Sequence, residues 1–242
     1  MILYSVDELI NALESEDDPH KFRSGLLIAV RRYFDELVGG IHPDQAAANY
    51  YEAFNAGLNG LRIALSSYNR DYNINYEAVR NKIRPFVDKI PALFGTETRR
   101  LETWDRPFPP KYFLKEVEIK LREQCIDLVV PIAAAGLEPA CILADTLGVK
   151  DVFAIRYSPL RLKDYSVKIP AGIPESHLSS IFTGKNVLIV DDIVSTGKTM
   201  QEAMNWVSRY SPAMVNFTAI SDSPFIDKPK LVLSMQPFQL AV

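Results

Sequence analysis

The feature that most constrains the fold is the stretch NVLIVDDIVSTGKTM at residues 186–200, in which an unbroken apolar run ends on two adjacent aspartates. A short apolar run of this kind is typical of a strand that is buried on both faces, as the strands of parallel sheets are. Further strands are predicted at residues 126–132, 151–158 and 214–221, and helices at residues 111–123, 138–148 and 197–210. Because strands that alternate with helices form βαβ units, the sequence predicts an α/β domain with a parallel sheet. In such sheets, ligands bind beyond the carboxyl ends of the strands.

The end of this stretch, TGKT at residues 196–199, matches only part of a nucleotide-binding P-loop. A P-loop requires G-x-x-x-x-G-K-[ST], and with Gly197 as the second glycine the first would be residue 192. That residue is Asp192. A carboxylate there would repel the oxygens of a triphosphate, so we expect a different ligand.

A sugar phosphate fits both halves of the stretch. Ionised carboxylates, here Asp191 and Asp192, accept hydrogen bonds from neighbouring hydroxyl groups of a ribose. The start of the following helix offers backbone amides to a phosphate, and Thr196 and Thr199 add hydroxyl groups. The alternative is that the two aspartates end a strand and cap a helix without binding a ligand.

Residues 187–199, VLIVDDIVSTGKT, resemble the phosphoribosyl pyrophosphate (PRPP) binding motif of the type I phosphoribosyltransferases. The resemblance covers roughly residues 111–235 and implies an α/β fold, a parallel sheet with flanking helices, preceded here by an all-helical N-terminal region. It also implies that Asp191 and Asp192 hold the ribose 2′ and 3′ hydroxyls and act as catalytic residues by stabilising positive charge on the ribose ring. The residues that it assigns to PRPP binding are Asp191, Asp192, Ile193, Val194, Ser195, Thr196, Gly197, Lys198 and Thr199.

The same resemblance implies two further parts of the site. Family members bind pyrophosphate on a loop after the first core strand, which here is the cation-free turn Ala133, Ala134, Ala135 and Gly136; a plain strand-to-helix turn is the alternative. They also have a mobile loop that closes over the active site. This loop falls here between residues 158 and 185, and residues 159–183 are expected to be poorly ordered without ligand. The mobile-loop cations that would compensate for the neutral turn are Arg156, Arg161, Lys163 and Lys168, with a solvated basic loop as the alternative.

The implied activity is that of a pentosyltransferase, a glycosyltransferase that moves 5-phosphoribosyl from PRPP to a nitrogen base and releases pyrophosphate in nucleotide metabolism and salvage. Mg²⁺ is expected to be bound through the substrate, so no protein metal ligand is assigned. Ser195 stands where the hypoxanthine-guanine branch has an aspartate. We therefore expect 6-oxopurines to be poor acceptors, and we rank orotate or another pyrimidine slightly above adenine. One alternative is a catalytically weak PRPP- or nucleotide-sensing regulatory protein of the same fold, and another is a nucleotide-binding scaffold for a protein partner.

The first hundred residues carry a helical pattern. Ser5 and Glu8 fit a capping box at a helix start, and Pro85 marks a bend or a boundary in a later helix. Prolines at 107, 109 and 110 indicate a boundary between a helical domain at residues 1–105 and the α/β domain at residues 106–242. The helical domain is expected to serve as a hood over the acceptor base, a homodimer surface or a partner surface. Apolar residues at helical spacing are Phe22, Leu26, Val30, Phe34 and Leu37, followed by Tyr50, Phe54, Leu58, Leu61 and Leu65.

Composition excludes some classes of function. The formal net charge of −3 provides no overall basic field, so we expect no nucleic acid partner. We also expect no membrane span, because no apolar run reaches the length that one needs. The acidic start of the chain is unlike a signal peptide. Cys125 and Cys141 are expected to be buried thiols in a reducing cytosol, so the sequence predicts a cytoplasmic protein.

Overall fold

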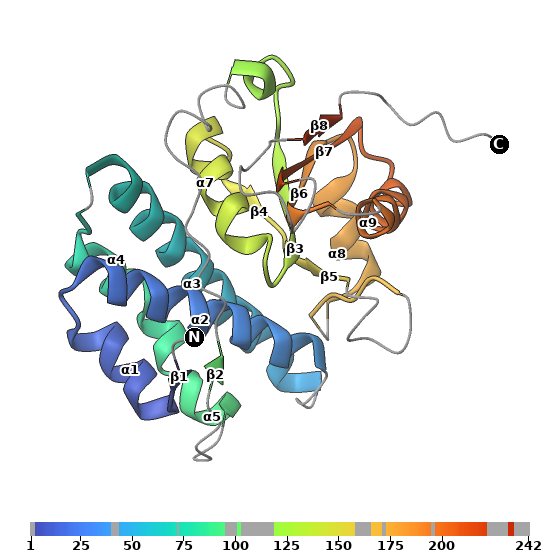
Figure 1. Ribbon diagram of the computed structural model, residues 1–242. Coiled ribbons are helices and arrows are strands. Elements are labelled where there is room, and N and C mark those ends of the chain that lie inside the picture. The colour runs from blue at the N-terminus through green and yellow to red at the C-terminus, as the bar shows by residue number, and fades with distance from the viewer. Residues whose placement is uncertain are drawn as a thin grey trace. The chain divides into compact units, whose positions relative to one another are not determined.

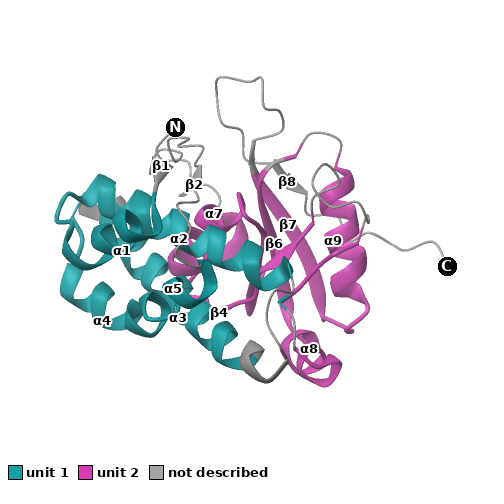
Figure 2. Ribbon diagram, turned by 90° about the horizontal axis from the view of Figure 1, so that it is seen from below, with its two compact units in different colours: residues 1–108, 170–172 teal, residues 109–169, 173–242 magenta. Residues whose placement is uncertain are grey.

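The computed structural model describes residues 3–39, 44–71, 73–94, 101–102, 119–157, 166–170, 173–194, 197–221 and 232–234. The chain divides into two compact units, which Figure 2 shows in different colours. Unit 1 comprises residues 1–108 with 170–172, and unit 2 comprises residues 109–169 with 173–242. Residues 105 and 106, between which the sequence predicts a domain boundary, lie outside the described residues.

Unit 1 is a group of packed helices with one short pair of strands (Figure 1). Its helices are α1 (Val6–Ser15), α2 (Pro19–Gly39), α3 (Asp44–Asp71), α4 (Tyr76–Val87) and α5 (Ile90–Phe94). The strands β1 (Leu3–Tyr4) and β2 (Leu101–Glu102) pair antiparallel. Helix α3 packs along both α2 and α4. The helical fold expected for this region is confirmed, with these two strands as an addition.

Local signals in the sequence set the ends of the helices in unit 1. The predicted capping box is present, because the Glu8 amide donates to Ser5 Oγ at 3.1 Å and the Ser5 amide donates to Glu8 Oε2 at 2.7 Å. Helix α2 ends at Gly39, and the five apolar residues that the sequence analysis placed on it at helical spacing are all buried. Pro85 is not a helix boundary, because α4 continues to Val87.

Two glycines let α3 and α4 approach closely. A Cβ atom added to Gly57 would lie 2.7 Å from Cδ2 of the Phe86 ring, and a Cβ atom added to Gly60 would collide with Cγ2 of Ile83. Side chains at these two positions of α3 would therefore push α4 away. The absence of a side chain, more than helix propensity, explains why glycine stands at these positions.

Unit 2 is built on a six-stranded sheet, counted over the described residues, with the strand order β4-β3-β6-β7-β8 and with β5 also paired to β3. The β3, β4, β5, β6 and β7 strands run parallel, and β8 pairs antiparallel with β7. Helix α7 covers one face of the sheet, while α8 and α9 lie on the other (Figures 1 and 2). The strands are β3 (Leu128–Ala133), β4 (Asp151–Val152), β5 (Ile155–Arg156), β6 (Asn186–Ile193), β7 (Met214–Ser221) and β8 (Val232–Ser234), and the helices are α7 (Leu137–Leu147), α8 (Glu175–Phe182) and α9 (Lys198–Ser208).

The centre of this sheet is the apolar run that the sequence analysis singled out. Residues 187–190 of β6 are each at most 1% exposed, since β3 and β7 flank the strand and helices cover both of its faces. Leu188 and Val190 pack with Ala140 and Leu143 of α7 in one hydrophobic cluster. The predicted α/β fold with a parallel sheet is therefore confirmed.

Two details of unit 2 differ from the prediction. The single strand predicted at residues 151–158 is instead two short strands, β4 and β5, with Phe153 and Ala154 between them. The Phe153 amide donates to the Val129 carbonyl at 3.0 Å, while its ring packs edge-on against Phe182 at a centroid distance of 5.4 Å. Cys141 is buried as predicted, whereas Cys125 is exposed in a turn with a φ of 47°.

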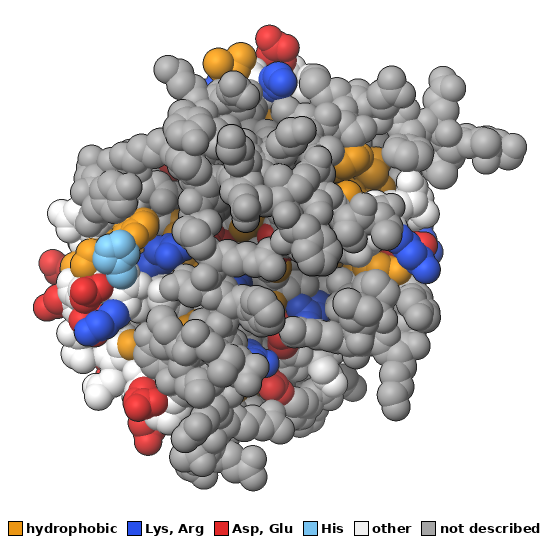
Figure 3. Space-filling view, in the orientation of Figure 1, with side chains coloured by type: hydrophobic (Ala, Val, Ile, Leu, Met, Phe, Trp, Pro, Cys, Tyr) orange, Lys and Arg blue, Asp and Glu red, His pale blue; other side chains and the backbone are white. Residues whose placement is uncertain are grey.

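On the part of the surface that is described, charges of both signs are mixed. Figure 3 shows acidic and basic side chains lying close together on the side where Figure 1 has α1 and α4. Among the described helices, none combines the length and the hydropathy that a membrane crossing would need.

Candidate functional site

The two aspartates of the motif lie at the carboxyl end of the central strand. Asp191 is opposite Ala219 of β7, and Val190, just before it, is opposite Pro131 of β3. This is the edge of a parallel sheet at which ligands bind. Asp191 is 8% exposed and Asp192 is half-buried, so one carboxyl group lies within the protein and its neighbour is accessible.

The electrostatics of Asp191 are unusual for a carboxyl group. Burial raises the pKa of Asp191 well above its usual value, and the charge of Asp192 raises it further. The Asp192 amide, which donates to Asp191 Oδ1 at 2.9 Å, and the Arg156 guanidinium both oppose this rise in pKa. Close carboxyl groups with raised pKa values are more frequent at functional sites than elsewhere.

Helix α9 begins at Lys198, a few residues after the aspartates. Its N-cap residue, Gly197, has a φ of 76° and has no side chain of its own that could cap the helix. The first amides of α9 therefore have no partner within the helix, which is the arrangement that binds phosphates. Thr199 is half-buried and Lys198 is exposed. Ser195 and Thr196, which the sequence analysis assigned to the same turn, lie outside the described residues.

The turn predicted to bind pyrophosphate lies beside the aspartates. It connects β3 to α7 and contains a cis peptide bond between Ala133 and Ala134. A Cβ atom added to Gly136 would be 2.5 Å from the backbone oxygen of Val190 and 2.7 Å from that of Ile132. Only glycine fits this contact, so the turn and the strand that carries Asp191 touch through their backbones.

The mobile-loop assignment is wrong for Arg156. This residue belongs to strand β5, opposite Ala133 of β3, and is 8% exposed. Its backbone also forms a two-way bridge with Lys168, in which each amide donates to the other carbonyl at 2.7 Å. The sheet and this bridge hold the backbone of Arg156 in place. Lys168 is half-buried, and the other two predicted cations, Arg161 and Lys163, lie outside the described residues.

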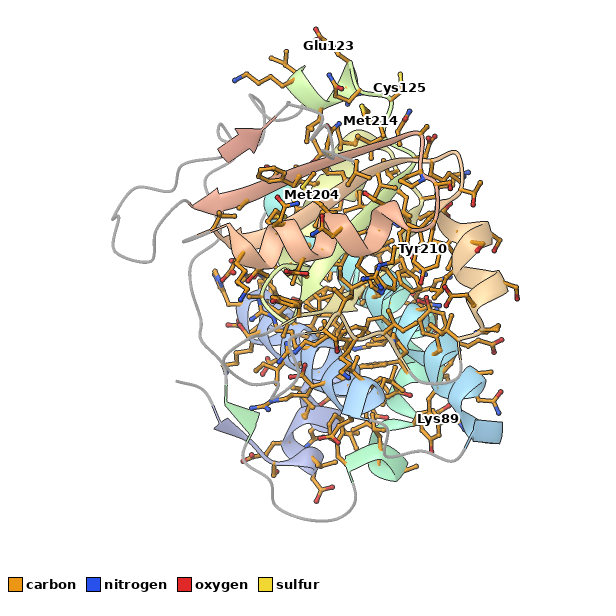
Figure 4. All side chains as sticks on the ribbon, turned by 90° about the vertical axis from the view of Figure 1, so that its right-hand side faces the viewer. Lys89, Glu123, Cys125, Met204, Tyr210 and Met214 are labelled. Carbon is orange, nitrogen blue, oxygen red and sulfur yellow. The ribbon has the colours of Figure 1, made fainter. Side chains whose placement is uncertain are left out.

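The predicted mobile segment at residues 159–183 contains a helix that the sequence analysis missed. Helix α8 buries Phe182, whose ring contacts Trp206 of α9 at a centroid distance of 5.7 Å and stacks on Tyr210 at 5.5 Å. Figure 4 labels Tyr210 at the end of α9, next to α8. The Thr183 hydroxyl donates to the Tyr210 carbonyl at 3.1 Å. Residues 175–183 are therefore packed structure, and the first part of the segment, residues 159–165, lies outside the described residues.

The sequence analysis also passed over Glu138. This carboxyl group lies in the first turn of α7, two residues after Gly136, and is 5% exposed. An acidic side chain in the first turn of a helix is favoured by the helix dipole. Its position two residues after Gly136, at the predicted start of a helix, was the sequence signal that could have marked Glu138 as a candidate site residue.

Comparison with known protein families agrees with the position of this site. A family model described as a phosphoribosyl transferase domain matches residues 115–231. The matched residues include the aspartate pair, the start of α9 and the turn after β3.

Individual relatives match to different extents. The chain is 30% identical over 159 residues to the adenine phosphoribosyltransferase of Bordetella avium, which covers 62% of this chain and 84% of that protein. With the adenine phosphoribosyltransferase of Bordetella pertussis the identity is 33% over 107 residues, covering 43% of this chain and 59% of that protein. The chain thus spans less than two thirds of the length of the latter. With the hypoxanthine-guanine phosphoribosyltransferase of Mus musculus the identity is 44% over 68 residues, covering 25% of this chain and 29% of that protein.

Among solved structures, the chain resembles the purine phosphoribosyltransferase from Pyrococcus horikoshii with a TM-score of 0.38 and 24% identity, covering 48% of this chain and 75% of that one. With a TM-score this low, the structural similarity supports no conclusion about function.

Proposed function

The chain belongs to the type I phosphoribosyltransferase family, and on that basis we propose that it transfers the 5-phosphoribosyl group of PRPP to a purine base and releases pyrophosphate. The observation that carries the proposal is the aspartate pair at the end of β6, followed by the turn at Gly197 and the start of α9 at Lys198. We also propose that this reaction serves nucleotide salvage.

In the proposed reaction, a nitrogen of the base forms a bond with the anomeric carbon while the bond to pyrophosphate breaks. Asp191 and Asp192 accept hydrogen bonds from the two ribose hydroxyls, and their charge stabilises the positive charge that develops on the ring. The amides at the start of α9, with Thr199, hold the 5-phosphate. The turn from Ala133 to Gly136 offers backbone groups to the pyrophosphate.

Mg²⁺ bound to PRPP would offset the negative charge that develops on the leaving pyrophosphate. The described residues contain no group of three or more His, Cys, Asp or Glu side chains suited to hold a metal ion. The proposal therefore assigns the ion to the substrate and names no protein ligand for it.

For the acceptor, two lines of argument converge on adenine. Ser195 replaces the acidic residue of the hypoxanthine-guanine branch, and a serine hydroxyl is a poor general base near neutral pH. This replacement disfavours hypoxanthine and guanine. Of the three relatives named above, two are called adenine enzymes and the third is called a hypoxanthine-guanine enzyme. We therefore propose adenine as the best acceptor, ahead of orotate or another pyrimidine, which the sequence analysis ranked slightly higher; the same assay tests both rankings.

Binding of PRPP is tested by thermal unfolding with Mg²⁺ present. A ligand that binds only the folded state, at about 100 times its Kd, adds about 2.7 kcal/mol of stability. For a chain of this size that corresponds to a rise in Tm of roughly 5–10 °C. The double variant Asp191→Asn/Asp192→Asn should lose most of this rise. The control is Asp151→Asn, because Asp151 is exposed at the opposite end of the sheet, where β4 pairs with the start of β3.

Turnover is tested by release of pyrophosphate with adenine, hypoxanthine, guanine, orotate and uracil. Adenine should be the best acceptor, and the two 6-oxopurines should be slower by a factor on the order of 10² or more. Efficient turnover of hypoxanthine or guanine would contradict the argument from Ser195.

A second candidate function is a regulatory protein that binds PRPP or a nucleotide without turning it over. The cation-free turn from Ala133 to Ala135 favours it, because the leaving pyrophosphate has no described cation on that turn. A stabilising effect of PRPP together with no pyrophosphate release for any of the five bases would select this alternative.

A further inference from the structure

Gly136 presses the proposed pyrophosphate turn against the central strands through backbone contacts. Its φ of −70° and ψ of −11° lie in the right-handed helical region, which every residue can adopt, so its conformation does not require glycine. A Cβ atom added here would lie 2.5 Å from the oxygen of Val190, and 2.7 Å and 3.0 Å from the oxygen and the nitrogen of Ile132. All three are backbone atoms, which cannot rotate away as the end of a side chain can. The close approach of the turn to the strands is therefore what requires glycine.

This contact lies at the carboxyl end of the pairing between β3 and β6. The register of the two strands ends with Pro131 opposite Val190, and Asp191 is the next residue along β6. The Gly136 amide also donates to the Ile132 carbonyl at 3.0 Å, which ties the turn to the end of β3. Gly136 thus bears on both strands at the edge of the sheet where the ligand is proposed to bind.

The contact leads directly to the ribose carboxylates. The Val190 oxygen belongs to the peptide group that joins Val190 to Asp191. Because a peptide group is planar, a shift of this oxygen also turns the nitrogen and the Cα atom of Asp191. The carboxyl group of Asp191 is tied to the same stretch of backbone, since the Asp192 amide donates to its Oδ1 at 2.9 Å. A movement of Gly136 is therefore passed to this carboxyl group through one planar peptide group and one hydrogen bond.

We propose that Gly136 is a positioning residue that couples the two halves of the PRPP site: pyrophosphate bound at the turn fixes the peptide group before Asp191, and this strengthens the binding of ribose 5-phosphate by the aspartate pair. The second ligand meets backbone that the first has already ordered, so it loses less conformational freedom on binding. By reciprocity, ribose 5-phosphate strengthens the binding of pyrophosphate by the same factor. The inference rests on the proposed function for the identity of both ligands.

The first test measures the Kd of ribose 5-phosphate by calorimetry, with and without saturating pyrophosphate, at one fixed concentration of Mg²⁺. In the unmodified chain, pyrophosphate should lower this Kd by at least about fivefold. In Gly136→Ala the ratio of the two Kd values should fall close to one, because the added methyl group forces the turn and the strand apart. The control is Gly148→Ala at the other end of α7, where a φ of 72° strains the new residue but nothing lies within 4 Å. This control loses stability without touching the site and should keep the full ratio.

Two results of this test would overturn the inference. One is a ratio near one in an unmodified chain that binds both ligands. The other is a ratio in Gly136→Ala equal to that of the unmodified chain, which would show that the two ligands act on each other directly, for example through a shared Mg²⁺ ion. Failure of the unmodified chain to bind either ligand would instead contradict the proposed function itself.

The second test uses the unmodified chain alone and decides the matter if Gly136→Ala does not fold or does not bind pyrophosphate. Pyrophosphate with Mg²⁺ is added without ribose 5-phosphate, and NMR follows the amides of residues 134–136 together with the carbonyl carbon of Val190. The Val190 signal should shift over the same range of pyrophosphate concentration as the amides of the turn. The carbonyl carbon of Val187, near the start of β6, is the control and should not shift. A shift confined to the turn, with the Val190 carbonyl and the Asp191 amide unchanged, would overturn the inference.

Discussion

At the scale of single residues, the burial of Asp191 should lower stability near neutral pH, while its proposed role is to bind the ribose of PRPP. The pKa of its carboxyl group is raised in the folded protein, first by burial and then by the charge of Asp192. The folded state therefore holds this proton more tightly than the unfolded chain does. Stability from this source is fully present below the usual pKa of 3.8 and is lost as the pH rises through the raised value.

We predict that Asp191→Asn raises Tm by a few degrees near neutral pH and flattens this part of the pH dependence, because the amide needs no charge within the protein. The same variant should bind PRPP more weakly. Tm measured from acidic to neutral pH, with and without Mg²⁺ and PRPP, checks both outcomes. A variant that is less stable than the unmodified chain near neutral pH would show that the burial of Asp191 is not unfavourable.

Gly197 provides a second prediction at this scale. Its φ of 76° lies in the left-handed region, but a Cβ atom added there would have nothing within 4 Å. Gly197→Ala should therefore cost only the conformational penalty, about 1–2 kcal/mol. It should also weaken PRPP binding, because it disturbs the turn that aims the first amides of α9.

The matched control is Gly148→Ala. Gly148 has a φ of 72° at the C-terminal end of α7 and equally open space around it. Chemical denaturation should show similar losses of stability for the two variants, while calorimetry should show weaker PRPP binding for Gly197→Ala alone. Equal PRPP affinities of the two variants would show that the turn at Gly197 does not contribute to PRPP binding.

At the scale of elements, the contact between α3 and α4 depends on glycine. Alanine is the better helix former by about 1 kcal/mol, so replacement of an exposed glycine in a helix would be stabilising. Overpacking typically costs about 1–3 kcal/mol, and at Gly60 the added methyl group would collide with Ile83. We predict that the collision wins and that Gly60→Ala lowers the free energy of unfolding.

The control for this prediction is Glu52→Ala on the exposed part of the same helix, which should change stability by only a few tenths of a kcal/mol. Combining Gly60→Ala with Ile83→Ala should cost less than the sum of the two single changes, since the new methyl group partly fills the space that Ile83 leaves. Urea denaturation of the four variants measures these terms. A more stable Gly60→Ala protein would mean that α4 can move away at little cost.

At the scale of the whole molecule, every described residue assigned to PRPP belongs to unit 2. We predict that PRPP with Mg²⁺ slows hydrogen exchange at the end of β6, the start of α9 and the turn before α7, while the amides of α1 to α5 keep their rates. A ligand raises protection where it is bound and where local opening must break its contacts. The Asp191→Asn/Asp192→Asn variant is the control, and in this variant PRPP should not slow exchange at any of these places. Slower exchange in α2 or α3 with PRPP alone would give the helical unit a part in PRPP binding.

The sequence by itself determined the features that depend on neighbouring residues. The apolar run at residues 187–190 defined the central strand, Ser5 and Glu8 defined the start of α1, and the glycine at 197 marked the turn into α9. The spacing of hydrophobic residues, helix capping and turn formation depend on residues that are close in the sequence, so the sequence alone reveals them.

Only the tertiary structure decided which residues, distant in the chain, lie close together in space. It moved Arg156 from a predicted loop into the sheet, set α8 within a segment that was expected to be mobile, and buried Asp191 while leaving Asp192 half-exposed. Strand pairing, side-chain burial and the pKa of a carboxyl group depend on residues that are far apart in the chain. A local sequence pattern does not show which of these residues will meet, because strand pairing, burial and shifts in pKa arise only after the strands and helices have packed.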